Sequence, residues 1–125
     1  MPEFYALSVR QPWADCIIYG GKNVENRSWR TFYRGPLLIH ASKKMEPGAI
    51  RDFCRHPNKS YRDKRDLGGI IGIVDLDYCV RGYCSMWAKS GMWHWVLRRP
   101  RPLPFTPCPG RQGLFKIDME IANAS

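Results

Sequence analysis

The sequence predicts an α+β fold that is mostly β: a small, mostly antiparallel barrel of five to six strands with two or three short helices. Short apolar or alternating runs recur along the chain and are separated by turns rich in glycine and proline. Segments with helical spacing are few and do not alternate strictly with the strands, which argues against a doubly wound parallel sheet. A length of 125 residues with 44% hydrophobic residues predicts a single domain over residues 1–125.

The N-terminal half is predicted to hold three strands and one helix. The first strand is expected at 4–9, in the run FYALSV. A helix is expected over 11–21, with Pro12 in its first turn, where a missing N–H costs little, and two glycines at its end. Further strands are expected at 24–29 and 37–42.

The C-terminal half is predicted to add one helix and three strands. A short helix is expected at 46–54, before a polar loop. The most apolar run, at 70–80, predicts a central strand that bends at its glycine. The alternating segment 92–99 predicts another strand, and 113–121 predicts the closing one. Between them, the five prolines of 100–110 predict an irregular, stiff connection.

The charge of the chain indicates an anionic partner. Lysine and arginine number 20 against 11 acidic residues, which gives a formal net charge of +9 and a pI near 9.6. A small domain this basic most often meets nucleic acid, although a charge kept for solubility would look the same. No apolar run approaches the roughly 20 residues that span a membrane, so we expect no membrane association.

The cysteines and the N-terminus indicate an intracellular protein, either cytoplasmic or associated with the nucleus or nucleoid. The five cysteines are odd in number and scattered, which favours a reducing compartment. The N-terminus has no charged segment followed by a long apolar one, so we expect no signal peptide. Cys79 and Cys84 have no second Cys/His pair at finger spacing, so no metal site and no cofactor are expected.

The segment GGKNVENRSWR, residues 20–30, groups charged side chains at one place. Alternation along a strand puts Glu25, Arg27 and Trp29 on the same face, with Lys22 just before them. Partly buried charges are costly unless they are paired, and such clusters are often kept for function. Glu25 could pair with Lys22 or Arg27 and still accept a hydrogen bond from a base. A solvated face or a purely structural ion pair is the alternative.

Aromatic residues interleaved with cations suit the stacking of single-stranded bases, and the chain has five tryptophans. Most of these indoles are expected in the core: Trp93, Trp95 and Leu97 share one face of their strand. His94 lies on the opposite face, where a half-buried structural histidine is the simpler interpretation.

Other candidate site residues lie on strands and in basic segments. His40 and Ser42 share a strand face, which permits a Ser/His hydrolase, but no orienting carboxylate is evident and a polar cleft is favoured. Arg98 and Arg99 cluster beside the proline-rich segment, and the loop 51–65 is basic. Both could hold phosphates, and both could equally be solvated loops.

Taken in register, these segments resemble an ASCH domain, a branch of the PUA-like superfamily. The signature is a glycine and a lysine, then a glutamate three residues later and an arginine two residues after it: Gly21, Lys22, Glu25 and Arg27. The flanking runs LSVRQPW and RGPLLIHAS match as well, and the likeness covers roughly residues 5–118.

The resemblance implies a small PUA-like barrel with helices around a cleft lined by the signature residues. It also implies binding of RNA or DNA, while some ASCH proteins look like enzymes, namely a ribonuclease and an amidohydrolase acting on acylated cytidine. The amidohydrolase type carries a threonine where this chain has Glu25, so this chain departs from that pattern.

We therefore expect a module that binds RNA or single-stranded DNA, with no prediction of its oligomeric state. The alternatives are a hydrolase in which Lys22 acts as base and Glu25 handles protons, and a protein-interaction module with an acidic partner. The expected ligand-binding residues are Lys22, Glu25, Arg27, Trp13, Gln11, His40, Ser42, Arg98 and Arg99.

Overall fold

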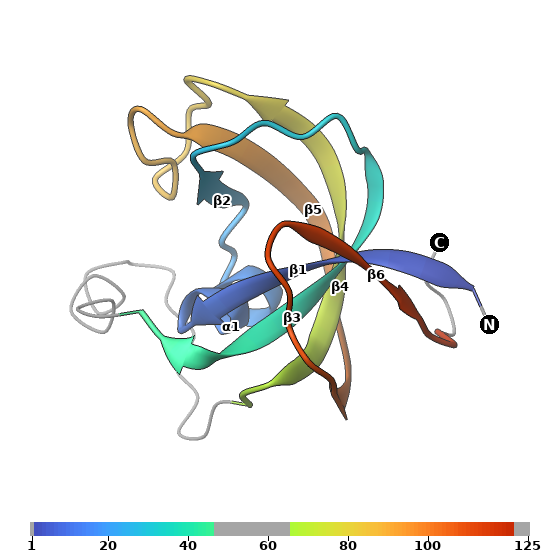
Figure 1. Ribbon diagram of the computed structural model, residues 1–125. Helices are drawn as coiled ribbons and strands as arrows, with labels where there is room; N and C mark the ends of the chain where they lie inside the picture. The colour runs from blue at the N-terminus through green and yellow to red at the C-terminus, as the bar shows by residue number, and fades with distance from the viewer. Residues whose placement is uncertain (1, 47–65, 122–125) are drawn as a thin grey trace.

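The computed structural model describes residues 2–46 and 66–121, which form one short α-helix and six strands (Figure 1). The elements in chain order are β1 (Glu3–Gln11), α1 (Trp13–Tyr19), β2 (Val24–Arg27), β3 (Gly35–Met45), β4 (Gly69–Val80), β5 (Trp93–Pro107) and β6 (Leu114–Asp118). The mostly β character is as predicted. Of the helix expected at 46–54, only the first residue lies within the described part of the chain, and the loop 51–65 lies outside it.

The strands form one six-stranded sheet in the order β2-β5-β4-β3-β1-β6. The pairings are antiparallel except for β1 with β3, which run parallel. The sheet is strongly curved, but its edge strands β2 and β6 do not pair with each other (Figure 1). The predicted barrel is therefore not confirmed for the described residues, in which the sheet stays open: β2 is only four residues long and pairs only with the start of β5.

The core lies on both faces of the central strands. On one face, α1 packs its Ile17 and Ile18 against β1, β3, β4 and β5, together with the buried Trp95. On the other face, Ala6, Leu38 and Phe115 belong to a second apolar cluster. Burial on both faces explains why the central strands are apolar runs rather than alternating ones.

The proline-rich segment corrects a prediction, because it continues β5 as a strand instead of forming an irregular connection. Its partner is β4, where Gly72 aligns with Pro102 and Gly69 with Pro107. β2 pairs only with Trp93–Val96, so the outer edge of this half of β5 has no partner strand among the described residues. Prolines are tolerated at such an edge, because a missing N–H breaks no ladder there.

The bend predicted at Gly72 falls where the ladder of the central strand is irregular. The register of β4 against β5 shifts between Ile70 and Gly72. A Cβ on Gly72 would lie 2.8 Å from the backbone carbonyl oxygen of Arg101 and 2.5 Å from Cδ1 of Ile18, so a side chain here would force β5 and α1 to shift. No helix among the described residues is long and apolar enough to cross a membrane.

Candidate functional site

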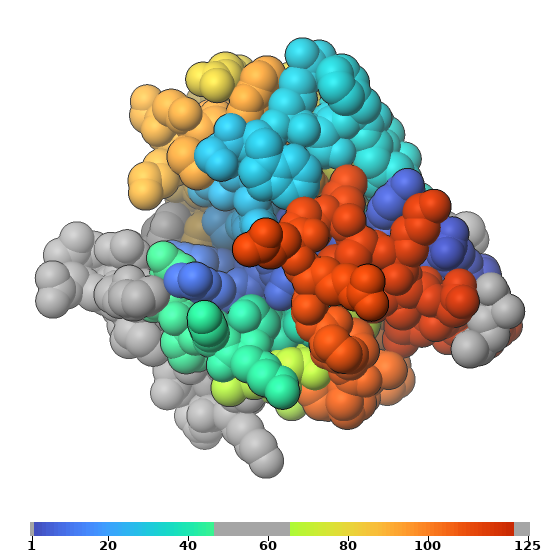
Figure 2. Space-filling view, viewed as in Figure 1, coloured from blue at the N-terminus to red at the C-terminus, as the bar shows by residue number. Residues whose placement is uncertain are grey.

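A wide cleft with a volume of about 1670 Å³ opens beside β2. Its walls come from β1, β2 and β3, together with the segments 86–92 and 108–113. Figure 2 shows this region from outside, with the light-blue chain around β2 beside the orange-red segment that precedes β6. The cleft is lined by more cations than acids. The acids are Glu25 and Glu46, and the cations are Arg10, Lys22, Arg27, Lys43, Lys44, Lys89 and Arg111.

Lys22 is buried at the inner end of the cleft, with 5% of its surface exposed. Its Nζ lies 5.2 Å from the ring centres of both Trp13 and Trp87, so two indoles hold the ammonium. Burial lowers the pKa of Lys22 below the ordinary value of 10.5, and the negative charge of Glu25 partly opposes this shift. Within residues 2–46 and 66–121, the ammonium group makes no hydrogen bond or ion pair.

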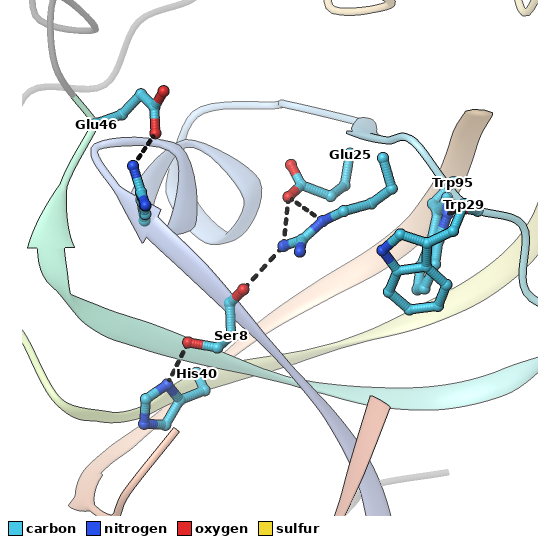
Figure 3. A network of polar contacts seen from close by, with 8 residues as sticks. Ser8, Glu25, Trp29, His40, Glu46 and Trp95 are labelled. Atoms are coloured by element: carbon cyan, nitrogen blue, oxygen red, sulfur yellow. Dashed lines mark hydrogen bonds and ion pairs between the residues drawn. The ribbon is translucent and has the colours of Figure 1, made fainter. Parts of the chain in front are cut away.

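Glu25 and Arg27 form the ion pair that the strand alternation allowed. Nε and Nη2 of Arg27 lie 3.0 and 2.9 Å from the same oxygen, Oε2 of Glu25 (Figure 3). The other oxygen, Oε1, accepts no hydrogen bond from the described part of the chain. The pair therefore fixes the carboxylate in place and leaves one acceptor in the cleft.

Arg27 also connects this pair to a second polar contact. Its Nη2 donates to the carbonyl oxygen of Ser8 at 2.8 Å, and the Ser8 hydroxyl lies 3.0 Å from Nδ1 of His40 (Figure 3). Nε2 of His40 donates to the carbonyl of Cys108 at 2.8 Å. A carbonyl can only accept, so Nε2 carries the hydrogen and, in the neutral ring, Nδ1 accepts from the Ser8 hydroxyl.

Gly110 closes the cleft over this contact. A Cβ at this position would lie 2.8 Å from Cε1 of His40 and 3.0 Å from Oγ of Ser8. The backbone of the 108–113 segment thus covers the Ser8 hydroxyl directly. The Ser8 hydroxyl thus holds His40, which in turn holds this segment through the Cys108 carbonyl.

Trp29 contributes an aromatic wall. It lines the cleft and meets the buried Trp95 edge to face, with ring centres 4.7 Å apart (Figure 3). The indole N–H of Trp95 donates to the carbonyl of Trp29 at 3.2 Å, which fixes this part of the backbone. Trp95 and Leu97 are buried and Trp93 is partly buried against the core, as their shared face predicted.

The structure places six of the nine expected ligand-binding residues along the cleft. They are Trp13, Lys22, Glu25, Arg27, His40 and Ser42. Ser42 does not bind His40: its hydroxyl accepts from the backbone N–H of Lys44 at 3.1 Å, so the Ser42–His40 hydrolase pair is not formed.

Gln11 does not line the cleft but joins β1 to α1. Its side-chain oxygen accepts from the N–H of Asp15, and its Nε2 donates to the Asp15 carboxylate and to the carbonyl of Asp66. The predicted binding role of Gln11 therefore gives way to a structural one.

Arg98 and Arg99 are not brought to the cleft either. Arg98 lies 2.7 Å from a carboxylate oxygen of Asp77, and Arg99 lies 3.0 Å from one of Asp75. Both aspartates belong to β4, which pairs with β5 outside the cleft. These two expected ligand-binding residues therefore lie away from the cleft, because cross-strand pairing directs them to β4.

His94 has the structural role that was considered the simpler one. It is buried, its Nδ1 accepts from the N–H of Tyr83 at 3.0 Å, and its Nε2 donates to the carbonyl of Lys89 at 2.7 Å. In the part of the chain that the structure describes, no three His, Cys, Asp or Glu side chains are grouped to hold a metal ion.

The sequence interpretation missed Ser8, Trp87 and the 108–113 segment as parts of the site. Trp87 was visible as one of five indoles, but nothing in its neighbourhood indicated contact with Lys22. Ser8 and Cys108 meet His40 through strand pairing and a loop that are distant in sequence.

Comparisons with known proteins agree with this architecture. The model of the ASCH domain family matches residues 7–105. Activating signal cointegrator 1 is 36% identical to this chain in its human form, over 83 residues, and 34% identical in its mouse form. The matched region makes up 61% of this chain and 14% of each relative, so the chain spans about one seventh of their length.

Among solved structures, a point mutant of ZmASCH from Zymomonas mobilis is similar, with a TM-score of 0.59 and 15% identity. The superposition covers 91% of this chain and 89% of that one, which supports the fold alone. The family match extends from β1 to the proline-rich half of β5 and includes β2 with its Glu25–Arg27 pair. This chain belongs to the ASCH domain family.

Proposed function

We propose that this chain binds RNA or single-stranded DNA in the cleft, with one base held at its inner end. The observation that carries the proposal is a free carboxylate oxygen, Oε1 of Glu25, in a cleft whose charged lining residues are mostly cations and which three tryptophans also line. Membership of the ASCH family supports it, because the resemblance implied binding of RNA or DNA.

Glu25 is the element that selects the base. Its free oxygen accepts from an exocyclic amine or a ring N–H, while Arg27 prevents the carboxylate from turning away. Trp13 and Trp29 offer aromatic surface at the same end of the cleft. A base without an N–H donor on that edge leaves a desolvated carboxylate oxygen unpaired, which costs affinity.

The outer cleft holds the phosphates. Lys43, Lys44, Lys89 and Arg111 line it, and no ion pair neutralises them within the described part of the chain. Each phosphate neutralised by such a cation adds about 0.7 to the slope of log affinity against log salt for a single strand.

The test is a titration of labelled single-stranded RNA, its DNA counterpart and the duplexes at two salt concentrations. Lys89→Ala should weaken single-strand binding and reduce the salt slope, because its ammonium lines the cleft. Lys116→Ala is the matched control: it removes the same charge from β6, where the lysine pairs with Glu3 outside the cleft. Equal effects of the two variants would contradict binding in the cleft.

A hydrolase is the second candidate, and the lowered pKa of Lys22 favours it. A lysine whose pKa moves toward neutrality can act as a general base, and Glu25 is close enough to affect it. The same titration reads product length on RNA and turnover of an acylated cytidine nucleoside. Cleavage or turnover lost with Lys22→Ala and Glu25→Gln would favour the hydrolase; binding with intact ligand would favour the module.

A further inference from the structure

Outside the cleft, two arginines and two aromatic rings form a surface cluster, which we call the outer stack: the exposed Arg30, Phe32 and Arg81 and the half-buried Trp93. The guanidinium of Arg30 lies 4.5 Å from the ring centre of Phe32 and 5.3 Å from that of Trp93. The guanidinium of Arg81 lies 4.7 Å from the same indole. Arg30 thus joins the two rings, and Trp93 joins the two cations.

Phe32 is the most exposed large hydrophobic residue among those described, with 79% of its surface accessible. The core gains almost nothing from a ring in this position, since the hydrophobic contribution scales with the area removed from water. The segment that carries it follows β2 and stands at the surface in the view of Figure 2, where it is cyan. A ring held in place by a guanidinium and open to solvent is available to stack on a planar ligand.

The two guanidinium groups keep their hydrogen-bond donors for a ligand. Neither Arg30 nor Arg81 makes an ion pair with the described residues. The arginines farther along β5 differ, since Arg98 and Arg99 each contact an aspartate. Two neighbouring guanidiniums without carboxylates attract a phosphate backbone.

The outer stack is continuous with the rim of the cleft. In the register of β2 against β5, Arg27 is aligned with Trp93. Trp29 and Met92, which adjoin Arg30 and Trp93 in sequence, both line the cleft. A nucleic-acid strand that leaves the cleft past Trp29 thus meets the stack at the next residue, Arg30.

We propose that the outer stack is a second nucleotide subsite for single-stranded nucleic acid leaving the cleft. One base stacks on Phe32, and the phosphates on either side of it meet Arg30 and Arg81. This inference rests on the proposed function, because it extends the same bound strand. It commits to nucleic acid over an acidic peptide because planar rings alternate with cations, the arrangement that serves bases and phosphates together.

The experiment compares a short single strand of about 4 nucleotides, which fills the cleft alone, with a longer one of about 12. Phe32→Ala should lower affinity for the longer strand about tenfold and leave the short one unchanged. Phe32→Tyr keeps the ring plane and should retain binding, whereas Phe32→Leu keeps only the apolar character and should not. Since these side chains are exposed, thermal unfolding should show that all variants remain folded.

The charges are tested separately. The double change Arg30→Gln with Arg81→Gln should reduce the salt slope for the longer strand only. If both strands bind and neither the ring nor the arginine variants affect the longer one, the outer subsite is refuted while the cleft stands. If neither strand binds, the proposed function fails and this inference with it. Phe32-dependent binding of polyglutamate in place of nucleic acid would also overturn it.

Discussion

Two basic regions of this chain look alike in sequence and differ in the folded molecule. One is the cleft, and the other is the arginine cluster at the start of the proline-rich half of β5. In the cluster, Arg98 contacts Asp77 at 2.7 Å, while Arg99 and Arg101 contact Asp75 at 3.0 and 3.2 Å. In the cleft, Lys22 has two indoles and the nearby charge of Glu25, whose one bonded oxygen is held by Arg27.

The difference arises from strand pairing rather than from local charge density. β4 and β5 are antiparallel, and their register aligns Asp75 with Arg98, so the carboxylates of one strand face the guanidiniums of the other. β2 brings a single carboxylate to the inner cleft. In this chain, the acids of the strand that pairs with it therefore neutralise much of one basic run, whereas the cleft keeps more cations than acids.

The largest effect is expected on the free energy of unfolding, when the arginine of the cleft is replaced. Arg27→Gln should lower the free energy of unfolding by about 2–3 kcal/mol, because it leaves the buried Glu25 carboxylate without its partner and the Ser8 carbonyl without a donor. Arg98→Gln should cost less than about 1 kcal/mol, because its pair with Asp77 is largely exposed. Urea unfolding of both variants measures the difference.

A double substitution shows whether the stability lost in Arg27→Gln comes from breaking the ion pair. Adding Glu25→Gln to Arg27→Gln should recover part of the lost stability, since the neutral amide no longer needs a counter-charge. If Arg27→Gln were no more costly than Arg98→Gln, the Glu25–Arg27 pair would be as dispensable as a surface ion pair.

Lys22→Met is expected to change the free energy of unfolding by less than Arg27→Gln does, and the size of the change depends on pH. Burial lowers the pKa of Lys22 in the folded chain, so at alkaline pH below 10.5 the unfolded chain binds a proton that the folded chain has lost. Stability then rises with pH in that window through this group. Below the folded pKa the wild-type chain carries the full cost of the buried charge, and above 10.5 it carries none.

Methionine removes this titration and keeps an unbranched side chain between the two indoles. The free energy of unfolding of the wild type minus that of Lys22→Met should therefore increase as pH rises toward 10.5. Denaturant unfolding at several pH values gives the difference, in which the cysteine and tyrosine titrations cancel. A difference that is flat or falls with pH would mean that Lys22 is not strained by its burial.

The sequence predicted the inner site better than its surroundings. Strand alternation is a local rule, so it correctly predicted that Glu25 and Arg27 lie on one face and can pair. The contacts of His40 with Ser8 and Cys108 depend on β1 lying parallel to β3 and on the return of the 108–113 segment. No pattern within a single strand contains that information.

The errors in the fold have similar causes. The prolines along 100–110 indicated an irregular segment, yet this segment is a strand. Proline is tolerated in a strand at the edge of a sheet, and the sequence does not show which strands lie there. Closure into a barrel depends on the lengths of β2 and β6, and strand ends are the part that sequence patterns fix least well. The count of strands needed only their apolar runs: the described residues form six, within the predicted five to six.

The smallest effect is expected where one carboxylate is removed from the paired arginine cluster. Asp75→Asn removes the carboxylate that both Arg99 and Arg101 contact, so it should create a second, weak site for nucleic acid. We expect about a threefold gain in binding of a single strand at low salt, lost at high salt, because surface charge alone confers such affinity. Asp118→Asn on β6 is the matched control, since it makes the same change in net charge away from any arginine pair in the described structure. A gain confined to Asp75→Asn would show that cross-strand carboxylates keep this cluster from binding nucleic acid, whereas equal gains would show that net charge alone matters and that pairing does not distinguish the two basic regions.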